Sequence, residues 1–210
     1  MNAATRTIAL QGGMGVIEGL LDEPEGAPHG TAVLAHPHPL FGGTMTNKVV
    51  QTLARAFVQT GWRAVRFNFR GVGASEGVHD QGRGETDDML EVIRQVAPQG
   101  PLALAGFSFG AFVASHVVAR LPDRTPEKIV LVGTAASRFA VAPIAAELHP
   151  RTLVLHGEQD DTVPLSSVMD WALPQCLPVT VIPGVEHFFH GQLPLLKSLV
   201  VRHLLAPAPT

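Results

Sequence analysis

PLALAGFSFGAFVASHVVAR, residues 101 to 120, is the stretch from which the fold can be predicted. Its first part, Leu102 to Ala105, is the continuous apolar run expected of a strand buried on both faces. Its last part, Ala111 to Ala119, is rich in small residues and can place its phenylalanine and valines on one side of a helix. Ser108 lies between the two, within Gly106-Phe107-Ser108-Phe109-Gly110.

A serine between two such glycines, after a strand and before a helix, is typical of a nucleophile elbow. The turn is so tight that Gly106 and Gly110 stand where little more than a hydrogen fits as a side chain. The hydroxyl of Ser108 is then held clear of the sheet, and the N–H of Phe109 points at developing negative charge. The alternative is a chance match in a chain of 21 glycines, with Ser108 only capping a helix. The strand–turn–helix context favours the nucleophile.

The size and composition are those of one globular domain spanning residues 1–210. Hydrophobic residues make up 46% and charged residues 16%, and the net charge of -3 with no basic cluster argues against nucleic acid. The first ten residues do not resemble a signal peptide, and no apolar run reaches the ~18 residues of a membrane span. A single cysteine excludes internal disulfides. We therefore expect a cytoplasmic monomer or homodimer.

Strand-like and helix-like segments alternate along the chain. An opening hairpin is expected at 5–11 and 16–21, strands at 31–35, 62–69, 102–105, 128–132, 152–155 and 179–182, and helices at 49–58, 85–96, 111–119, 162–171 and 187–205. Thr44 or Thr46 is the expected cap of the first helix. The alternation predicts an α/β fold: a mostly parallel, doubly wound sheet flanked by helices, with functional loops at the carboxyl ends of its strands.

Two later loops offer an acid and a base for Ser108. Asp160 follows the strand at 152–155, and His187 follows the strand at 179–182. The order Ser108, Asp160, His187 is that of hydrolases with this elbow, in which the imidazole takes the serine proton and the carboxylate orients the imidazole. His156 and His190 are rival bases. Asp161 fits a helix cap better than Asp160 does.

The second oxyanion donor is expected in the loop after the strand at 31–35, which reads HPHPLFGG (36–43). Pro37 and Pro39 have no N–H. The nearest available donor is therefore His38, with Leu40 the alternative.

Two motifs point more weakly to other chemistry. His36 and His38 form an HxH pair, but no third ligand follows nearby, so we expect no metal and interpret His36 as fixing the loop. Gly71 and Gly73 match the start of a dinucleotide motif, but Glu76 takes the place of its third glycine, and we expect no cofactor. The same glycine-rich region contains four polar residues, Arg70, His79, Asp80 and Glu85. We expect them to form structural hydrogen bonds near the site.

Taken together, these motifs resemble those of small α/β-hydrolases. They are HPHPLFGGTMTNKVV (36–50), VRFNFRGVGASEG (65–77), GFSFG (106–110), HGEQDDTVP (156–164) and EHFFH (186–190). The combination is similar to lidless bacterial serine esterases related to dienelactone hydrolases, although the nucleophile here is serine, not cysteine. The resemblance implies Ser108 as nucleophile, His187 as base, Asp160 as acid, and Phe109 with His38 as oxyanion donors.

The segment 133–151 is too short for the helical cap that many relatives carry, so the site is expected to be open. The leading hypothesis is a serine carboxylesterase that cleaves small esters through an acyl-enzyme. The alternatives are a non-catalytic binding or scaffold protein with the same fold, and a metal-dependent hydrolase using the HxH pair.

Overall fold

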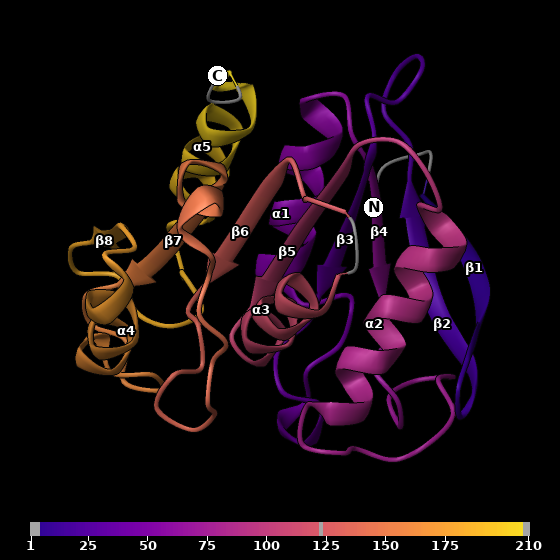
Figure 1. Cartoon of the computed structure of the whole chain (residues 1–210), viewed down its shortest axis with the longest axis horizontal. Coiled ribbons are helices and arrows are strands. Elements are labelled where there is room, and N and C mark those ends of the chain that lie inside the picture. Colours follow the sequence, from indigo (N-terminus) through magenta and orange to yellow (C-terminus); the bar gives the residue numbers. More distant parts are fainter. Residues whose placement is uncertain (1–4, 122–123, 208–210) are drawn as a thin grey trace.

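A central sheet of eight strands organises the molecule, in the order β1-β2-β4-β3-β5-β6-β7-β8 (Figure 1). The structure is a computed structural model and describes residues 5–121 and 124–207. β1 and β2 form an antiparallel hairpin, β2 pairs antiparallel with β4, and every pairing from β4 to β8 is parallel. The strands are β1 (Thr5–Gly12), β2 (Gly15–Asp22), β3 (Thr31–Ala35), β4 (Arg63–Phe67), β5 (Leu102–Phe107), β6 (Lys128–Val132), β7 (Thr152–Gly157) and β8 (Val179–Ile182).

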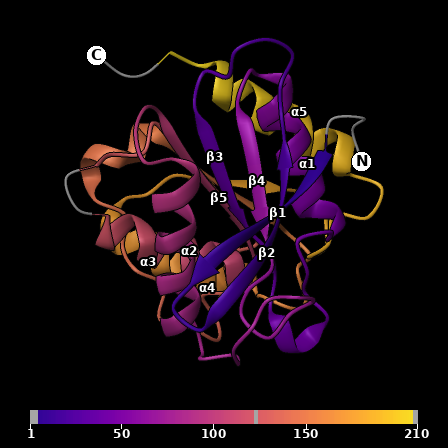
Figure 2. The same cartoon turned by 90° about the vertical axis from the view of Figure 1, so that its right-hand side faces the viewer.

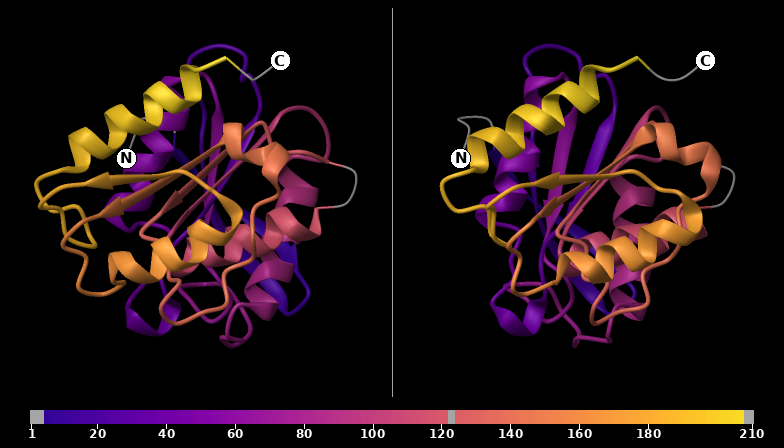
Figure 3. Two further views of the ribbon diagram at one scale, coloured as in Figure 1. Left: turned by 60° about the vertical axis from the view of Figure 1, so that its left-hand side comes forward. Right: turned by 90° about the vertical axis from the view of Figure 1, so that its left-hand side faces the viewer.

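Helices cover both faces of this sheet. They are α1 (Lys48–Gln59), α2 (Arg83–Val96), α3 (Phe109–Arg120), α4 (Leu165–Ala172) and α5 (Leu193–Leu205). Buried residues of α1 and α5 belong to one hydrophobic cluster, and those of α2, α3 and α4 belong to another. Figures 2 and 3 show the strands running between these two sets of helices. The predicted α/β fold, with a mostly parallel sheet flanked by helices, is confirmed.

The central strands are almost entirely apolar because they have no solvent-facing side; Thr31 and Lys128, at the first positions of β3 and β6, are the polar residues among them. All residues of β3, β5 and β6 are buried, as the continuous apolar runs predict. β1, at the edge, alternates between exposed and half-buried residues instead. Burial on both faces therefore explains why these strands could be found from the sequence.

The predicted cap of α1 and the predicted starts of α4 and α5 differ most from the structure. Asn47, rather than Thr44 or Thr46, caps α1, because its Oδ1 accepts the N–H groups of Val49 at 2.9 Å and Val50 at 3.4 Å. α4 begins at Leu165 rather than at residue 162, and α5 begins at Leu193 rather than at residue 187. Each has a proline at its start, either as N-cap or in the first turn, where the missing N–H costs nothing.

The loops that follow β3 to β8 leave the parallel strands at their carboxyl ends, which meet at one edge of the sheet. Between β6 and β7 the chain forms only loops and the short 3₁₀ helix η2 (Ala146–Arg151), so no cap covers this edge. Among the described residues, no helix has both the length and the apolar character that a membrane crossing requires.

Candidate active site

Ser108 occupies a strained turn between β5 and α3. Its φ of 56° and ψ of -114° lie outside the regions that residues with a side chain favour. The Ser108 N–H donates to the carbonyl of Val132 at 2.8 Å, which fixes the turn to β6. A Cβ at Gly106 would overlap the carbonyl of Gly110, and one at Gly110 would overlap that of Ala35. The glycines are therefore required by close backbone approach.

A chain of hydrogen bonds links Ser108 to two residues from the loops after β7 and β8. Nε2 of His187 lies 3.1 Å from Oγ of Ser108, and Nδ1 of His187 lies 2.6 Å from Oδ2 of Asp160. All three residues are buried, with exposed fractions of 7%, 2% and 6% for Ser108, His187 and Asp160. Because a carboxylate only accepts, the proton of the neutral imidazole is on Nδ1, and Nε2 is free to accept the serine proton.

The two oxygens of Asp160 have separate partners. Oδ1 accepts the N–H groups of Thr162 at 3.0 Å and Val163 at 2.7 Å, which leaves Oδ2 for His187. Asp161, predicted as the helix cap, is exposed and lies four residues before α4. Asp160, rather than Asp161, therefore accepts two backbone N–H groups in the way that a helix cap does. It does so within the loop before α4, while its other oxygen faces the imidazole of His187.

The two rival histidines lie in different surroundings. His190 is exposed, and its Nδ1 lies 3.0 Å from Oε1 of Glu186. His156 is buried, and its Nε2 lies 2.9 Å from the carbonyl of Val163 and 3.5 Å from Oδ2 of Asp160. Burial lowers the pKa of His156, so its ring is neutral. The negative charge of Asp160 is therefore available to stabilise a positive charge on His187. Neither rival contacts Ser108 by a hydrogen bond.

The loop after β3 approaches the serine with His38. The N–H of Leu40 donates to Nδ1 of His38 at 3.2 Å, within the 3₁₀ turn η1 (Pro39–Phe41). Within residues 5–121 and 124–207, the N–H groups of His38 and Phe109 have no hydrogen-bond acceptor. Of the two predicted alternatives, Leu40 is therefore already engaged and His38 is not. Burial, followed by the charge of His79, lowers the pKa of His38 and keeps its ring neutral.

His36 anchors the same loop to the sheet. Its Nδ1 donates to the carbonyl of Pro37 at 2.6 Å, and its Nε2 accepts the N–H of Phe69 at 3.0 Å. Burial lowers its pKa to about 4, so the ring is neutral at pH 7. Both nitrogens of His36 are engaged by backbone groups, which agrees with a residue that fixes the loop and leaves no nitrogen for a metal.

A cavity of about 280 Å³ opens beside the serine. Ser108, His187 and His38 line this cavity. Two exposed aromatic residues, Phe41 and Phe188, line it as well. The guanidinium of Arg138 lies 5.7 Å from the centre of the Phe41 ring. The arrangement can bring a small acyl group to the serine hydroxyl, with an aromatic rim around it.

Comparison with known proteins agrees with this fold. The model of the α/β hydrolase fold family matches residues 40–150. An α/β serine hydrolase without a lid from Xanthomonas campestris is 34% identical, with a TM-score of 0.86 over 100% of this chain and 99% of that one. An α/β serine hydrolase homologue from Coxiella burnetii is 37% identical, with a TM-score of 0.79 over 96% and 97% of the two chains.

A protein of Rickettsia prowazekii is 31% identical over 199 residues, which are 87% of this chain and 81% of that one. The specific relation to dienelactone hydrolases stays a prediction. From the matched family model and the similarity to lidless bacterial serine hydrolases over nearly the whole chain, the protein belongs to the α/β-hydrolase family.

Proposed function

We propose that the protein is a serine carboxylesterase that cleaves small esters through an acyl-enzyme. The observation that carries this proposal is the hydrogen-bonded chain from Ser108 through His187 to Asp160. A serine hydroxyl is a weak nucleophile until a neighbouring imidazole takes its proton. Here the imidazole has the required tautomer and the required contact.

In the first half of the reaction, Oγ of Ser108 attacks the ester carbonyl and its proton passes to Nε2 of His187. Asp160 stabilises the imidazolium without taking up the proton. The carbonyl oxygen, now negative, accepts the N–H groups of Phe109 and His38. When the tetrahedral intermediate collapses, His187 gives its proton to the leaving alcohol and the acyl group stays on Ser108.

In the second half, His187 takes a proton from water, and the resulting hydroxide attacks the acyl-enzyme. The same two N–H groups stabilise the second tetrahedral intermediate. The collapse of this intermediate returns the proton from His187 to Oγ of Ser108 and releases the carboxylic acid. The enzyme is thereby regenerated with the tautomer that it had at the start.

The size of the cavity supports a short acyl group. Its volume of about 280 Å³ is at the lower end of ordinary ligand sites, and no cap stands over it to bury a long chain. We expect p-nitrophenyl acetate and butyrate to be hydrolysed with higher kcat/KM than the laurate and palmitate esters. Ser108→Ala is the matched control for non-enzymatic hydrolysis. Rates that peak at the long chains would contradict the small-ester assignment, and equal rates for wild type and Ser108→Ala would contradict an esterase.

A further inference from the structure

A second buried carboxylate and imidazole lie next to the oxyanion donors. Glu85, in the first turn of α2, has no exposed surface. Its Oε1 accepts the N–H of Asp80 at 2.9 Å, and its Oε2 accepts the N–H of Gly82 at 2.8 Å. Nδ1 of His79 lies 2.7 Å from Oε1 of Glu85. The loop after β4 and the start of α2 thus fix both oxygens of Glu85, which is in close polar contact with the ring of His79, although Nδ1 of His79 lacks hydrogen-bond geometry toward it.

The ring of His79 packs against the two residues that the proposed function uses as oxyanion donors. Its centre lies 4.8 Å from that of His38 and 5.5 Å from that of Phe109. The rings of His38 and Phe109 are 4.9 Å apart, so the three side chains form a closed group. His38 comes from the loop after β3 and Phe109 from the start of α3. His79 is therefore one of the contacts that relate these two segments to the loop after β4, beside Phe69, whose ring centre lies 5.5 Å from that of Phe109.

We propose that the pair His79 and Glu85 is a positioning device for the oxyanion hole. It holds the backbone of His38 and Phe109 at the separation that the negative oxygen requires. This inference rests on the proposed function, because it assigns a role to residues around the same site. His79 itself exchanges no proton with substrate and is a positioning residue.

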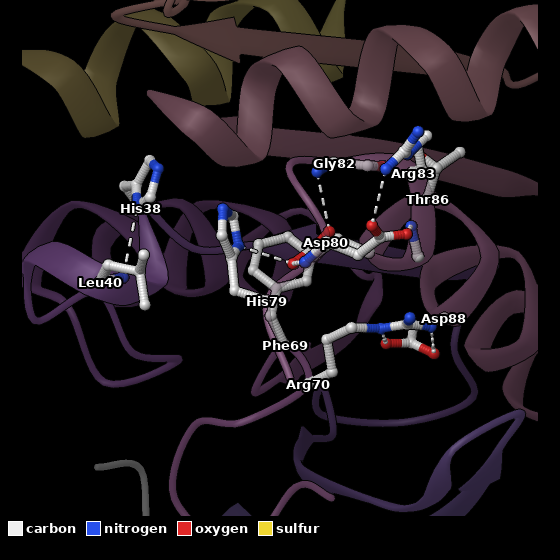
Figure 4. Close-up of polar contacts among 12 residues, drawn as sticks. His38, Leu40, Phe69, Arg70, His79, Asp80, Gly82, Arg83, Thr86 and Asp88 are labelled. Carbon is white, nitrogen blue, oxygen red and sulfur yellow. Dashed lines mark hydrogen bonds and ion pairs between the residues drawn. The ribbon is translucent and has the colours of Figure 1, made fainter. Parts of the chain in front are cut away.

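A neighbouring ion pair, Arg70 with Asp88, anchors the same loop away from the oxyanion donors. Nε of Arg70 donates to Oδ2 of Asp88 at 2.7 Å and Nη2 of Arg70 donates to Oδ1 at 2.8 Å, which ties the loop after β4 to α2. Figure 4 shows His79 between His38 on one side and this ion pair on the other. Arg70 and Asp88 thus offer a matched control: a buried pair in the same loop and helix that does not contact the oxyanion donors.

Two substitutions of His79 separate the packing of the ring from its polar contact with Glu85. His79→Asn keeps a side-chain N–H that can reach Glu85 but removes the ring that packs on His38 and Phe109. His79→Phe keeps a ring there but leaves the buried carboxylate of Glu85 without its imidazole. Asp88→Asn loosens the loop at the other pair. For each protein, kcat and KM for p-nitrophenyl acetate, the rate of labelling by a fluorophosphonate and the thermal midpoint are measured.

We expect the activity to depend on the ring of His79 and the stability to depend on the polar contact between His79 and Glu85. His79→Asn should lower kcat and the labelling rate about 10-fold, less than the ~10²–10³ of deleting one donor, with KM changed less than twofold. His79→Phe should retain more of kcat than His79→Asn but have the lower thermal midpoint. Asp88→Asn should lower the midpoint and leave kcat unchanged.

Three results would overturn the inference. One is a kcat of His79→Asn equal to that of wild type. Another is activity that falls in the same order as stability across the three variants, since that is the behaviour of a purely structural pair. In both cases, labelling of the wild-type protein by the fluorophosphonate would still support the proposed function. An unlabelled wild type would overturn the proposed function and this inference with it.

Discussion

The pair Asp160 and His187 and the pair Glu85 and His79 contain the same groups, but only the first is joined by a hydrogen bond, and the two imidazoles face different groups. In each, a buried carboxylate accepts two backbone N–H groups and lies within 2.6 Å or 2.7 Å of an imidazole Nδ1. The ring of His187 presents Nε2 to the hydroxyl of Ser108, whereas the ring of His79 packs on His38 and Phe109. A buried carboxylate beside an imidazole can therefore serve proton transfer or positioning, depending on which residues the imidazole ring contacts.

The largest loss of activity is expected from the pair that faces the serine. His187→Ala removes the group that accepts the Ser108 proton, so kcat should fall on the order of 10⁶-fold. KM should change little, because the imidazole acts in the transition state. Hydrolysis of p-nitrophenyl acetate measures the loss. A residual activity within 10²-fold of wild type would show that another group is the base.

The carboxylates should differ when each is made an amide. Asp160→Asn can keep its oxygen on the N–H groups of Thr162 and Val163, so its amide N–H₂ faces His187 and favours the tautomer with the proton on Nε2. That tautomer cannot accept the serine proton, and kcat should fall about 10⁴-fold.

Glu85→Gln should lower kcat no more than about 10-fold, because His79 transfers no proton. In this variant the side-chain N–H₂ takes the place of one carboxylate oxygen and faces a backbone N–H or the imidazole of His79. We therefore expect the free energy of unfolding to fall by about 1–3 kcal/mol. Steady-state kinetics and urea unfolding of both variants measure these effects. Equal losses of kcat would end the distinction between the two pairs.

The oxyanion loop can be tested at a single position. His38 has φ -53° and ψ 124°, which proline can adopt, so His38→Pro removes the N–H while leaving the backbone its shape. His38→Ala removes the ring and keeps the N–H. We expect His38→Pro to have a kcat ~10²–10³ below that of His38→Ala. Similar kcat values for the two variants would assign the second donor to another residue.

The last expected effect is on stability alone and comes from His36, which anchors the same loop. Its pKa is about 4 in the folded protein against 6.5 for an ordinary histidine, so the folded state favours the neutral ring. The stabilisation is complete above pH 6.5 and is lost as the pH falls, by about 3 kcal/mol at pH 4. Urea unfolding of wild type and His36→Gln should show a stability difference that narrows between pH 7 and pH 4. A constant difference would contradict this assignment.

Local pattern was enough for most of the fold. The strands at Lys128–Val132 and Val179–Ile182 have the predicted bounds, because apolar runs between polar loops define buried strands well. The turn at Ser108 was predictable because only glycine fits at Gly106 and Gly110. The sequence order of Ser108, Asp160 and His187 was informative because each follows a strand of a parallel sheet.

The parts that could not be predicted depend on contacts between distant segments. Asp160 and Asp161 both precede a helix, and only the folded loop shows which one reaches two backbone N–H groups. His79 stands in a glycine-rich loop whose path has no periodic pattern, and Glu85 stands in the first turn of the helix that follows it. The packing of His79 on His38 and Phe109 brings together the loop after β4, the loop after β3 and the start of α3, and nothing within any one of these segments signals it.

The most direct test of the account is mass spectrometry of wild type and Ser108→Ala after exposure to a fluorophosphonate probe. The account predicts one adduct per wild-type chain, located on the peptide that contains Ser108, and none on the variant. A folded wild-type protein that takes up no probe, or an adduct that persists in Ser108→Ala, would contradict an activated serine at this position.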